Sequence, residues 1–324
     1  MFKPFDQVRD RLERQYLDLP FAPESGLGKQ GLEEAWASLR ESHAGEPRIL
    51  LKARLFHLLC TKARLAPEPG DPFVGKIEHH GMLHALRRGW WQEEGKREFA
   101  HDPPEQPAAW RAQLDCGSHV CPDWRNLLKY GFTGLRDRAE AGEGVFHRAV
   151  SLVFEGMVEL VRRFQALQPS PALAALAEGP PKTLHDALQL AYLYNELLEL
   201  DGMEIRAMGR FDLLYVEFYR ADLAAGRLTE AGAKELLKYF WIKFFAKTQG
   251  KRFGKPFLFG PDANEFSRLA IAAYHEMRVV DPKFHIRLAA RTAPDFFEQV
   301  MDCIQDGCTS MALVNDERLV ETLR

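Results

Sequence analysis

Apolar side chains recur every three to four positions along most of roughly the first 250 residues, and this spacing predicts a succession of amphipathic helices. Phe5, Val8, Leu12 and Tyr16 show the pattern in the first of them. Stretches rich in Pro and Gly predict loops between the helices. Helices are predicted, in chain order, over 5–18, 32–44, 47–65, 122–134, 145–167, 184–200 and 229–250.

Several of these helices carry recognisable signals. Thr183 and Asp186 form a capping pattern ahead of a helix that is apolar on more than one face, which predicts that it lies between two layers. Pro122 occupies a helix start, and Gly131 and Gly134 are expected to end that helix. A later helix has an apolar stripe that is expected to pack in the core: Leu236, Leu237, Phe240, Trp241, Phe244 and Phe245.

The C-terminal part alternates between strand and helix patterns. Short apolar runs predict strands over 256–260, 284–289 and 310–314, and amphipathic runs predict helices over 265–280 and 294–307. Strands that alternate with helices in this way form βαβ units with parallel pairing. The chain is therefore predicted to be a helix-rich α/β protein.

Composition excludes several classes of protein. The 324 residues are 46% hydrophobic and 27% charged, with a net charge of −3, which is typical of a soluble globular protein. Basic residues form no patch, so no nucleic-acid partner is expected. No apolar run is long enough for a membrane span, and the N-terminus has no signal-peptide core. We therefore expect a cytoplasmic protein that does not bind membranes.

Cysteines and histidines give weak metal signals. The five cysteines are an odd number with C-x4-C spacings, which favours ordinary buried thiols over a disulfide framework or a zinc knuckle. His80 and His84 are four residues apart, as two metal ligands on one helical turn would be. His79 adds a third imidazole, but no H-E-x-x-H pattern accompanies them. No metal site is predicted, and a metal-dependent lyase remains a minor alternative.

A polar segment between two helices is the first candidate site. Glu204 and Arg206 lie in an otherwise apolar neighbourhood at the start of Gly202–Asp222, where a barrel-like enzyme would place a substrate pocket. His119, just before a predicted helix N-terminus, could meet an anionic or polar ligand or make a structural hydrogen bond. No P-loop, dinucleotide fingerprint, nucleophile elbow or kinase motif is present.

Four collinear blocks then give a resemblance. SHVCPDWRNLLKYGFTGL, PPKTLHDALQLAYL, GRFDLLYVEFYRADLAAGRLT and DPKFHIRLAARTAPDFFEQVMDCIQDGCTSMALVNDE resemble conserved blocks of the glycyl radical enzymes, the pyruvate formate-lyase family. The blocks span roughly residues 117–324, and residues 1–100 share the helical character and the PFVGK loop. The resemblance implies the first half of a ten-stranded α/β barrel of the pyruvate formate-lyase type, which consists of two five-stranded halves wrapped in helices.

The resemblance also implies a chemistry. In the family, a cysteine on one loop becomes a thiyl radical, a glycine on a second loop stores the radical, and a closed interior protects it. A separate radical-SAM activating enzyme installs the glycyl radical, and no other cofactor is bound. Complete members are commonly homodimers, so a homodimer is expected of the complete protein.

This chain ends shortly after Asn315, Asp316 and Glu317, before the position of the catalytic cysteine loop. The glycyl loop is absent as well. We therefore expect residues 1–324 to be one N-terminal domain, truncated before both loops, that does not perform the radical chemistry by itself.

The resemblance also suggests the residues that bind substrate. Pyruvate formate-lyase has an arginine at the position of His119 and dehydratase-type members often have histidine, which argues against pyruvate. The segment just before Gly209 and Arg210 holds a small polar "G-H-S" run in several dehydratases, and this chain has Gly202, Met203, Glu204, Ile205 and Arg206 there, one residue longer. We expect His119, Glu204, Ile205 and Arg206 to bind a small polar or zwitterionic substrate.

Two main hypotheses follow. The first is the N-terminal part of a glycyl radical enzyme, a dehydratase or lyase or a formate acetyltransferase-like enzyme, that abstracts hydrogen from a small polar substrate. The second is a catalytically inactive truncated paralogue that binds a partner chain or a small molecule. An open strand edge would favour pairing with a further chain.

Overall fold

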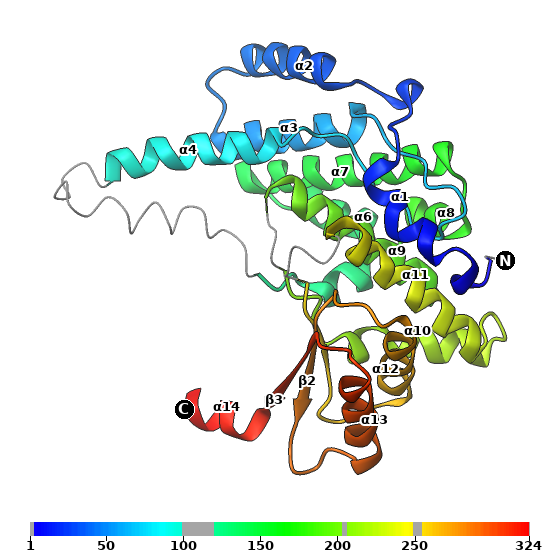
Figure 1. The fold of residues 1–324 in the computed structure, drawn as a ribbon. Coiled ribbons are helices and arrows are strands. Elements are labelled where there is room, and N and C mark those ends of the chain that lie inside the picture. Colours follow the sequence, from blue (N-terminus) through cyan, green and yellow to red (C-terminus); the bar gives the residue numbers. More distant parts are fainter. Residues whose placement is uncertain (1–2, 99–119, 203–205, 249–254, 324) are drawn as a thin grey trace.

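The computed structural model in Figure 1 describes residues 3–98, 120–202, 206–248 and 255–323. Its larger part is helical, and α7 packs against both α3 and α6. None of the helices in the described ranges is long and apolar enough to cross a membrane. The helical part comprises η1 (Phe5–Gln7), α1 (Arg9–Asp18), η2 (Pro23–Ser25), α2 (Lys29–Ser42), α3 (Arg48–Lys62), α4 (Met82–Glu98), α6 (Trp124–Glu140), α7 (Gly144–Leu167), α8 (Pro171–Glu178), α9 (Leu184–Leu200), α10 (Phe211–Ala224) and α11 (Glu230–Thr248).

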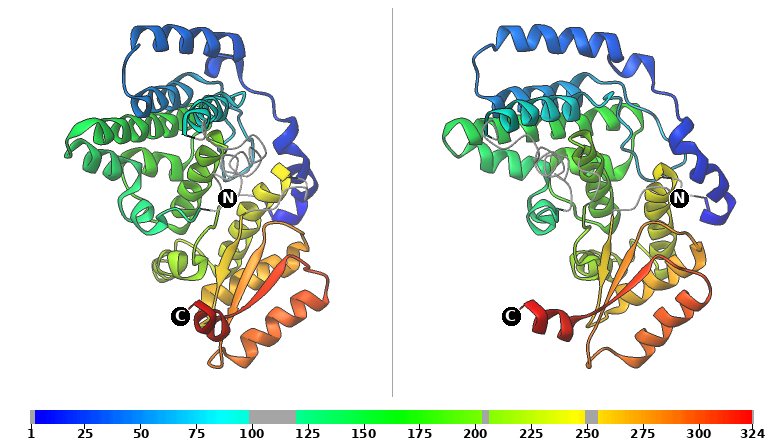
Figure 2. Two further views of the ribbon diagram at one scale, coloured as in Figure 1. Left: turned by 90° about the vertical axis from the view of Figure 1, so that its left-hand side faces the viewer. Right: turned by 60° about the vertical axis from the view of Figure 1, so that its left-hand side comes forward.

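The C-terminal part is a parallel βαβαβ unit. Strands β1 (Phe257–Phe259), β2 (Phe284–Leu288) and β3 (Met311–Asn315) pair in that order, all parallel. The connections are α12 (Glu265–Met277) and α13 (Pro294–Gln305), and α14 (Asp316–Leu323) follows β3. Figure 2 shows α14 projecting from the sheet end of the molecule. The parallel pairing predicted from the sequence pattern is confirmed.

Two further backbone segments extend this sheet beyond β1. The segment 206–210 makes a parallel bridge to β1 at Leu258, where the Leu258 amide donates to the Gly209 carbonyl at 3.1 Å. On its other side a parallel bridge joins Arg206 to Val120, and the Ala207 amide donates to the Val120 carbonyl at 2.9 Å. The order is therefore 120, 206–210, β1, β2, β3, all parallel. This confirms the helix-rich α/β fold class.

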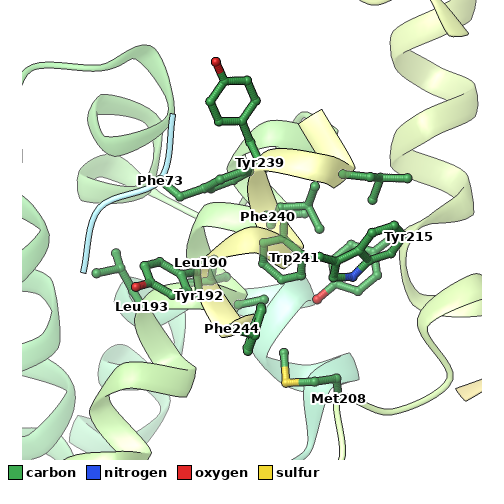
Figure 3. Packing of buried hydrophobic residues seen from close by; sticks show 14 of the residues in the cluster. Phe73, Leu190, Tyr192, Leu193, Met208, Tyr215, Tyr239, Phe240, Trp241 and Phe244 are labelled. Carbon is green, nitrogen blue, oxygen red and sulfur yellow. The ribbon is translucent and has the colours of Figure 1, made fainter. Parts of the chain in front are cut away.

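A buried aromatic cluster joins the helices to the sheet. Trp241 and Phe240 of α11 are fully buried, and Figure 3 shows them among side chains from neighbouring elements, with Tyr215 beside Trp241. The Trp241 ring lies 5.0 Å from that of Phe284 in β2, edge to face. Such pairs add to the hydrophobic gain of burial. The apolar stripe of α11 is therefore core, as predicted.

Helix α9 is buried on nearly all sides, as its sequence predicts. Its start has the expected capping box, in which the Asp186 amide donates to Thr183 Oγ1 at 3.1 Å and the Thr183 amide donates to Asp186 Oδ2 at 3.0 Å. It contacts five other helices: α4, α6, α8, α10 and α11. Because it is fixed on all sides, α9 can hold polar side chains in defined positions.

The predicted helix end is confirmed at Gly131 and was wrong at Gly134. Gly131 has φ 61° and ψ −177°, which interrupts the helical backbone within α6, and a second helical piece continues from this kink through Gly134 to Glu140. A side chain at Gly131 would place its Cβ 2.9 Å from the Cα of Pro180. Glycine is therefore required here for two reasons. Residues with a side chain rarely adopt this backbone conformation, and a side chain would collide with the loop before α9.

We expect Gly131→Ala to lower the free energy of unfolding by about 3 kcal/mol, because it adds backbone strain and a collision with backbone atoms. Gly89→Ala is the matched control, since Gly89 lies within α4 and has no atom near its missing Cβ. Alanine should stabilise there by about 0.5–1 kcal/mol. Urea unfolding of the two variants measures both effects, and equal effects would contradict the role of the kink.

Candidate functional site

The candidate site lies where α9 leads into segment 206–210. Of the four predicted substrate-binding residues, the structure describes Arg206, whereas His119, Glu204 and Ile205 lie outside the described residues. The bridge between Val120 and Arg206 joins the two residues that directly follow His119 and Ile205 in the sequence. The two parts of the chain that the sequence nominated are therefore neighbours in the sheet at this point.

The side chain of Arg206 is fully buried against α9. Its Nε and Nη2 donate to Asn195 Oδ1 at 3.1 and 2.8 Å, and Nη2 also donates to Glu199 Oε1 at 2.5 Å. Nη1 has no hydrogen-bond partner in the described part of the chain. A buried donor without a partner costs about 1–3 kcal/mol, so Arg206 keeps one amino group for a further acceptor. Contact between Arg206 and a substrate stays a prediction.

The Glu199 carboxylate forms ion pairs with three basic side chains: Arg206, Lys247 and Lys255. Lys247 is in very close contact with it, and Lys255 Nζ lies 3.0 Å from Glu199 Oε1. Burial alone would raise the pKa of the Glu199 carboxyl, but Lys247 and Lys255 outweigh this and, with Arg206, hold the pKa well below its usual range. Glu199 is therefore a fixed carboxylate near neutral pH.

The network continues from Glu199 along α9 and α11. Glu196 accepts from Lys247 Nζ at 2.7 Å and from the Tyr16 hydroxyl at 2.8 Å. Burial raises the pKa of the Tyr16 hydroxyl, and the neighbouring carboxylates add to the effect. Tyr16 therefore remains a neutral donor, and it connects α1 to the network.

The far end of the network is a buried lysine between two acids. Lys243 contacts Glu68 closely and donates to Asp71 Oδ2 at 2.9 Å, and all three side chains are almost fully buried. Burial alone would lower the pKa of Lys243, but Asp71 and Glu68 outweigh it and raise the pKa. This ion cluster fixes the loop after α3 to α11 and balances charges that could not be buried alone.

The network is best understood as a rigid support. Its described acids and bases pair with one another across α9, α11 and the loop after α3, so the pairs hold these elements together. What it determines is the position of segment 206–210. Its charged members are Glu68, Asp71, Glu196, Glu199, Arg206, Lys243, Lys247 and Lys255.

Sequence reasoning missed most of this network. Lys243 and Lys247 stand four residues apart in a helix that is otherwise strongly apolar, and Glu196 and Glu199 stand three apart in another. Charged residues at helical spacing within two core helices would have indicated paired buried ions. The signal was therefore present, although it could not show which acid meets which base.

Two of the three candidate metal-binding histidines make other contacts. His80 precedes α4 in a left-handed turn with φ 48°, and its Nε2 lies 2.6 Å from Glu78 Oε1. His79 Nδ1 accepts from the Gly81 amide at 3.1 Å. His80 and His84 therefore do not share a helical turn, so the geometric premise of the metal alternative was wrong. Within the described ranges, no three His, Cys, Asp or Glu side chains group together as ligands.

Three of the four described cysteines follow the expectation of buried thiols, and Cys121 does not. Cys60, Cys303 and Cys308 are buried free thiols, Cys121 is an exposed one, and Cys116 lies outside the described residues. Burial raises the pKa of the Cys60 thiol. None of the three buried thiols is therefore an accessible nucleophile.

Comparison with known proteins identifies the family of this architecture. Residues 112–254 and 260–324 match the family described as pyruvate formate lyase-like. The isethionate sulfite-lyase of Nitratidesulfovibrio vulgaris is 27% identical over 169 residues, which are 45% of this chain and 20% of that protein. The probable dehydratase YbiW of Escherichia coli is 24% identical over 321 residues, which are 79% of this chain and 39% of that protein.

Solved structures agree on the fold over nearly the whole chain. A glycyl radical enzyme from Archaeoglobus fulgidus superposes with a TM-score of 0.73 at 16% identity, covering 99% of this chain and 52% of that one. The hydroxyproline dehydratase from Clostridioides difficile gives a TM-score of 0.76 at 17% identity, with the same coverage. The chain therefore spans about half the length of these solved structures, and less than half of the curated relatives named above.

We expect Lys243→Met to lower the free energy of unfolding by about 3–5 kcal/mol, because it leaves the Glu68 and Asp71 carboxylates buried without their shared cation. Lys234→Met is the matched control, because Lys234 pairs with Glu276 on the surface and should contribute less than about 1 kcal/mol. Urea unfolding at neutral pH compares the two. Similar losses in both variants would contradict the role of the buried cluster.

The lowered pKa of Glu199 predicts a pH dependence of stability. Its folded pKa lies below the value of about 4.3 in an unfolded chain, so its stabilisation is complete above that pH and is lost as the pH falls toward the folded pKa. The difference in unfolding free energy between wild type and Glu199→Gln should therefore shrink as the pH falls from about 6 to about 3. Urea unfolding across this range measures it.

Glu298→Gln is the control for this series, because Glu298 is exposed on α13. We expect it to follow the wild type at every pH. A difference between wild type and Glu199→Gln that stays constant with pH would show that Glu199 contributes packing and not paired charge.

Proposed function

The chain belongs to the pyruvate formate lyase-like family, and from this premise we propose that it forms the N-terminal part of a glycyl radical enzyme acting on a small polar substrate. The proposed reaction class is that of a dehydratase or lyase. Its relatives include an isethionate sulfite-lyase and several dehydratases, which supports this class over formate acetyl transfer.

The observation that carries the proposal is an open parallel sheet. Five backbone segments run parallel in one sheet, and in the described residues β3 pairs with β2 on one side and with no strand on the other. Parallel sheets are normally covered on both faces and continued or closed at their edges. The chain also covers about half of solved glycyl radical enzymes. A further set of strands beside β3 would supply the rest.

The surface beyond β3 supports this arrangement. Leu313 of β3 is 43% exposed, and Leu319, Val320 and Leu323 of α14 are exposed as well. Apolar side chains gathered on a projecting helix and an edge strand mark a surface that another polypeptide covers. The second half of the enzyme, in a longer polypeptide or a separate chain, is the proposed occupant.

The chain's own residues would position the substrate in this enzyme. A thiyl radical on the second half would supply the hydrogen abstraction, while the network around Glu199 holds segment 206–210 in place. His119, Glu204 and Ile205 are proposed to contact the substrate, and the Nη1 of Arg206 is a donor that lacks a described partner. Histidine and a carboxylate beside a departing hydroxyl could orient it and move a proton.

Further parts of the proposal concern the complete protein. A radical-SAM activating enzyme would install the radical on the glycine of the second half, and the complete enzyme would be a cytoplasmic homodimer. The side chain at position 119 argues for a substrate other than pyruvate, since histidine lacks the bidentate fork of arginine for a carboxylate.

The first experiment is the intact mass of the native protein, isolated without oxygen from its source cells. We expect a polypeptide well above 37.0 kDa, or a second chain that co-purifies and carries the cysteine and glycine loops. After treatment with the activating enzyme, it should give an organic radical signal by electron paramagnetic resonance. Trans-4-hydroxy-L-proline, isethionate, glycerol and propane-1,2-diol are the first substrates to test, with pyruvate as the comparison.

Two results would count against the proposal. A single chain of about the calculated 37.0 kDa mass with no partner would favour the inactive paralogue that binds a partner or small molecule. Turnover of pyruvate in preference to all the hydroxylated compounds would overturn the substrate class while leaving the radical chemistry in place.

A further inference from the structure

A cavity is lined by residues of α9 other than those that hold Arg206. It has a volume of about 310 Å³ and is lined by side chains of α3, α7 and α9, together with Leu83 of α4. Phe56, Val153, Met157 and Leu197 give it an apolar wall. A volume of this size lies at the lower end of the range of small-molecule sites.

One end of this cavity is polar. Lys52 of α3 donates from Nζ to Asp201 Oδ2 at 2.7 Å, and both residues line the cavity. Asp201 is 8% exposed, and its second oxygen, Oδ1, has no partner among the residues that the structure describes. Asp201 is also the C-terminal cap of α9. A carboxylate is disfavoured at the negative end of a helix, so packing alone does not account for this residue.

We propose that this cavity binds a small amphipathic molecule with an aliphatic or aromatic body and a hydrogen-bond donor, a primary amine or a hydroxyl, at its head. The apolar wall takes the body, and the head donates to Asp201 at the polar end. A carboxylate head is disfavoured, because it would meet the Asp201 carboxylate and the negative end of α9, while Lys52 is already paired.

The site is distinct from the proposed radical site and does not depend on it. Leu197, Leu198 and Asp201 of α9 line the cavity, while Asn195 and Glu199 of the same helix hold Arg206. A molecule bound in the cavity would therefore contact the helix that fixes segment 206–210. Such a molecule is a candidate effector of the complete enzyme.

The test uses isothermal titration calorimetry of the 324-residue chain with three matched probes: hexylamine, 1-hexanol and hexanoate. We expect hexylamine and 1-hexanol to bind with dissociation constants of about 1 mM or lower, in line with the energy available to ligands of this size. Hexanoate should bind at least about tenfold more weakly.

Three variants locate the binding. Ala149→Leu fills the cavity from α7 and should abolish binding of both probes, and Ala53→Leu provides the same test from α3. Asp201→Asn should weaken hexylamine at least about tenfold. Thermal unfolding confirms that each variant is folded.

Ala221→Leu on the exposed face of α10 and Asp302→Asn on the surface of α13 are the matched controls and should bind like wild type.

Three outcomes would overturn the proposal. Absence of binding by hexylamine and 1-hexanol would show that the cavity takes no such ligand. Unchanged affinity in folded Ala149→Leu and Ala53→Leu variants would place the binding elsewhere. Hexanoate binding as tightly as hexylamine would overturn the assignment of a donor head group.

Discussion

The pairing of buried charges between α9 and α11 is the constraint on which the rest of this structure depends. Glu199 forms ion pairs with Arg206, Lys247 and Lys255. The ion cluster of Lys243 with Glu68 and Asp71 continues the same network. Each of these charges would be too costly to bury alone. Once they are paired, the helices and the first segments of the sheet can occupy only one relative position. The network therefore fixes the part of the chain that the sequence had nominated as a substrate site.

The aromatic core and the parallel sheet complete this arrangement in different ways. Trp241 and its neighbours bury the face of α11 against β1 and β2, so the sheet is firmly anchored on its helical side. At the other side β3 ends the described sheet, with apolar side chains exposed on the strand and on α14. A sheet that is anchored at one edge and open at the other matches a family in which the chain spans about half of each solved structure.

Helix α9 links two sites of different character. One face holds Arg206 through Asn195 and Glu199, and the face with Asp201 borders the apolar cavity. Coupling between two sites requires an element that both can influence, and α9 is such an element. Its burial on nearly all sides leaves α9 little room to move independently of the elements packed against it.

The sequence by itself determined the local elements, the parallel βαβ order and the family. The capping box of Thr183 and the apolar stripe of α11 are local signals that specify these two helices. Four blocks of residues in the family's order indicated a glycyl radical enzyme. These features depend on neighbours in the chain, so periodicity and motif spacing reveal them. Gly134 shows the limit, because its sequence signal is that of a helix end, yet the second helical piece of α6 continues through it to Glu140.

Only the tertiary structure decided which charges meet and where cavities remain. Lys243 pairs with Glu68 and Asp71 across more than 170 positions of sequence, and Lys52 meets Asp201 across 149. Such pairings depend on how helices pack, because many acids and bases are available to each charge and burial selects among them. The position of His80 outside α4 was decided in the same way, by a left-handed turn that spacing alone does not reveal.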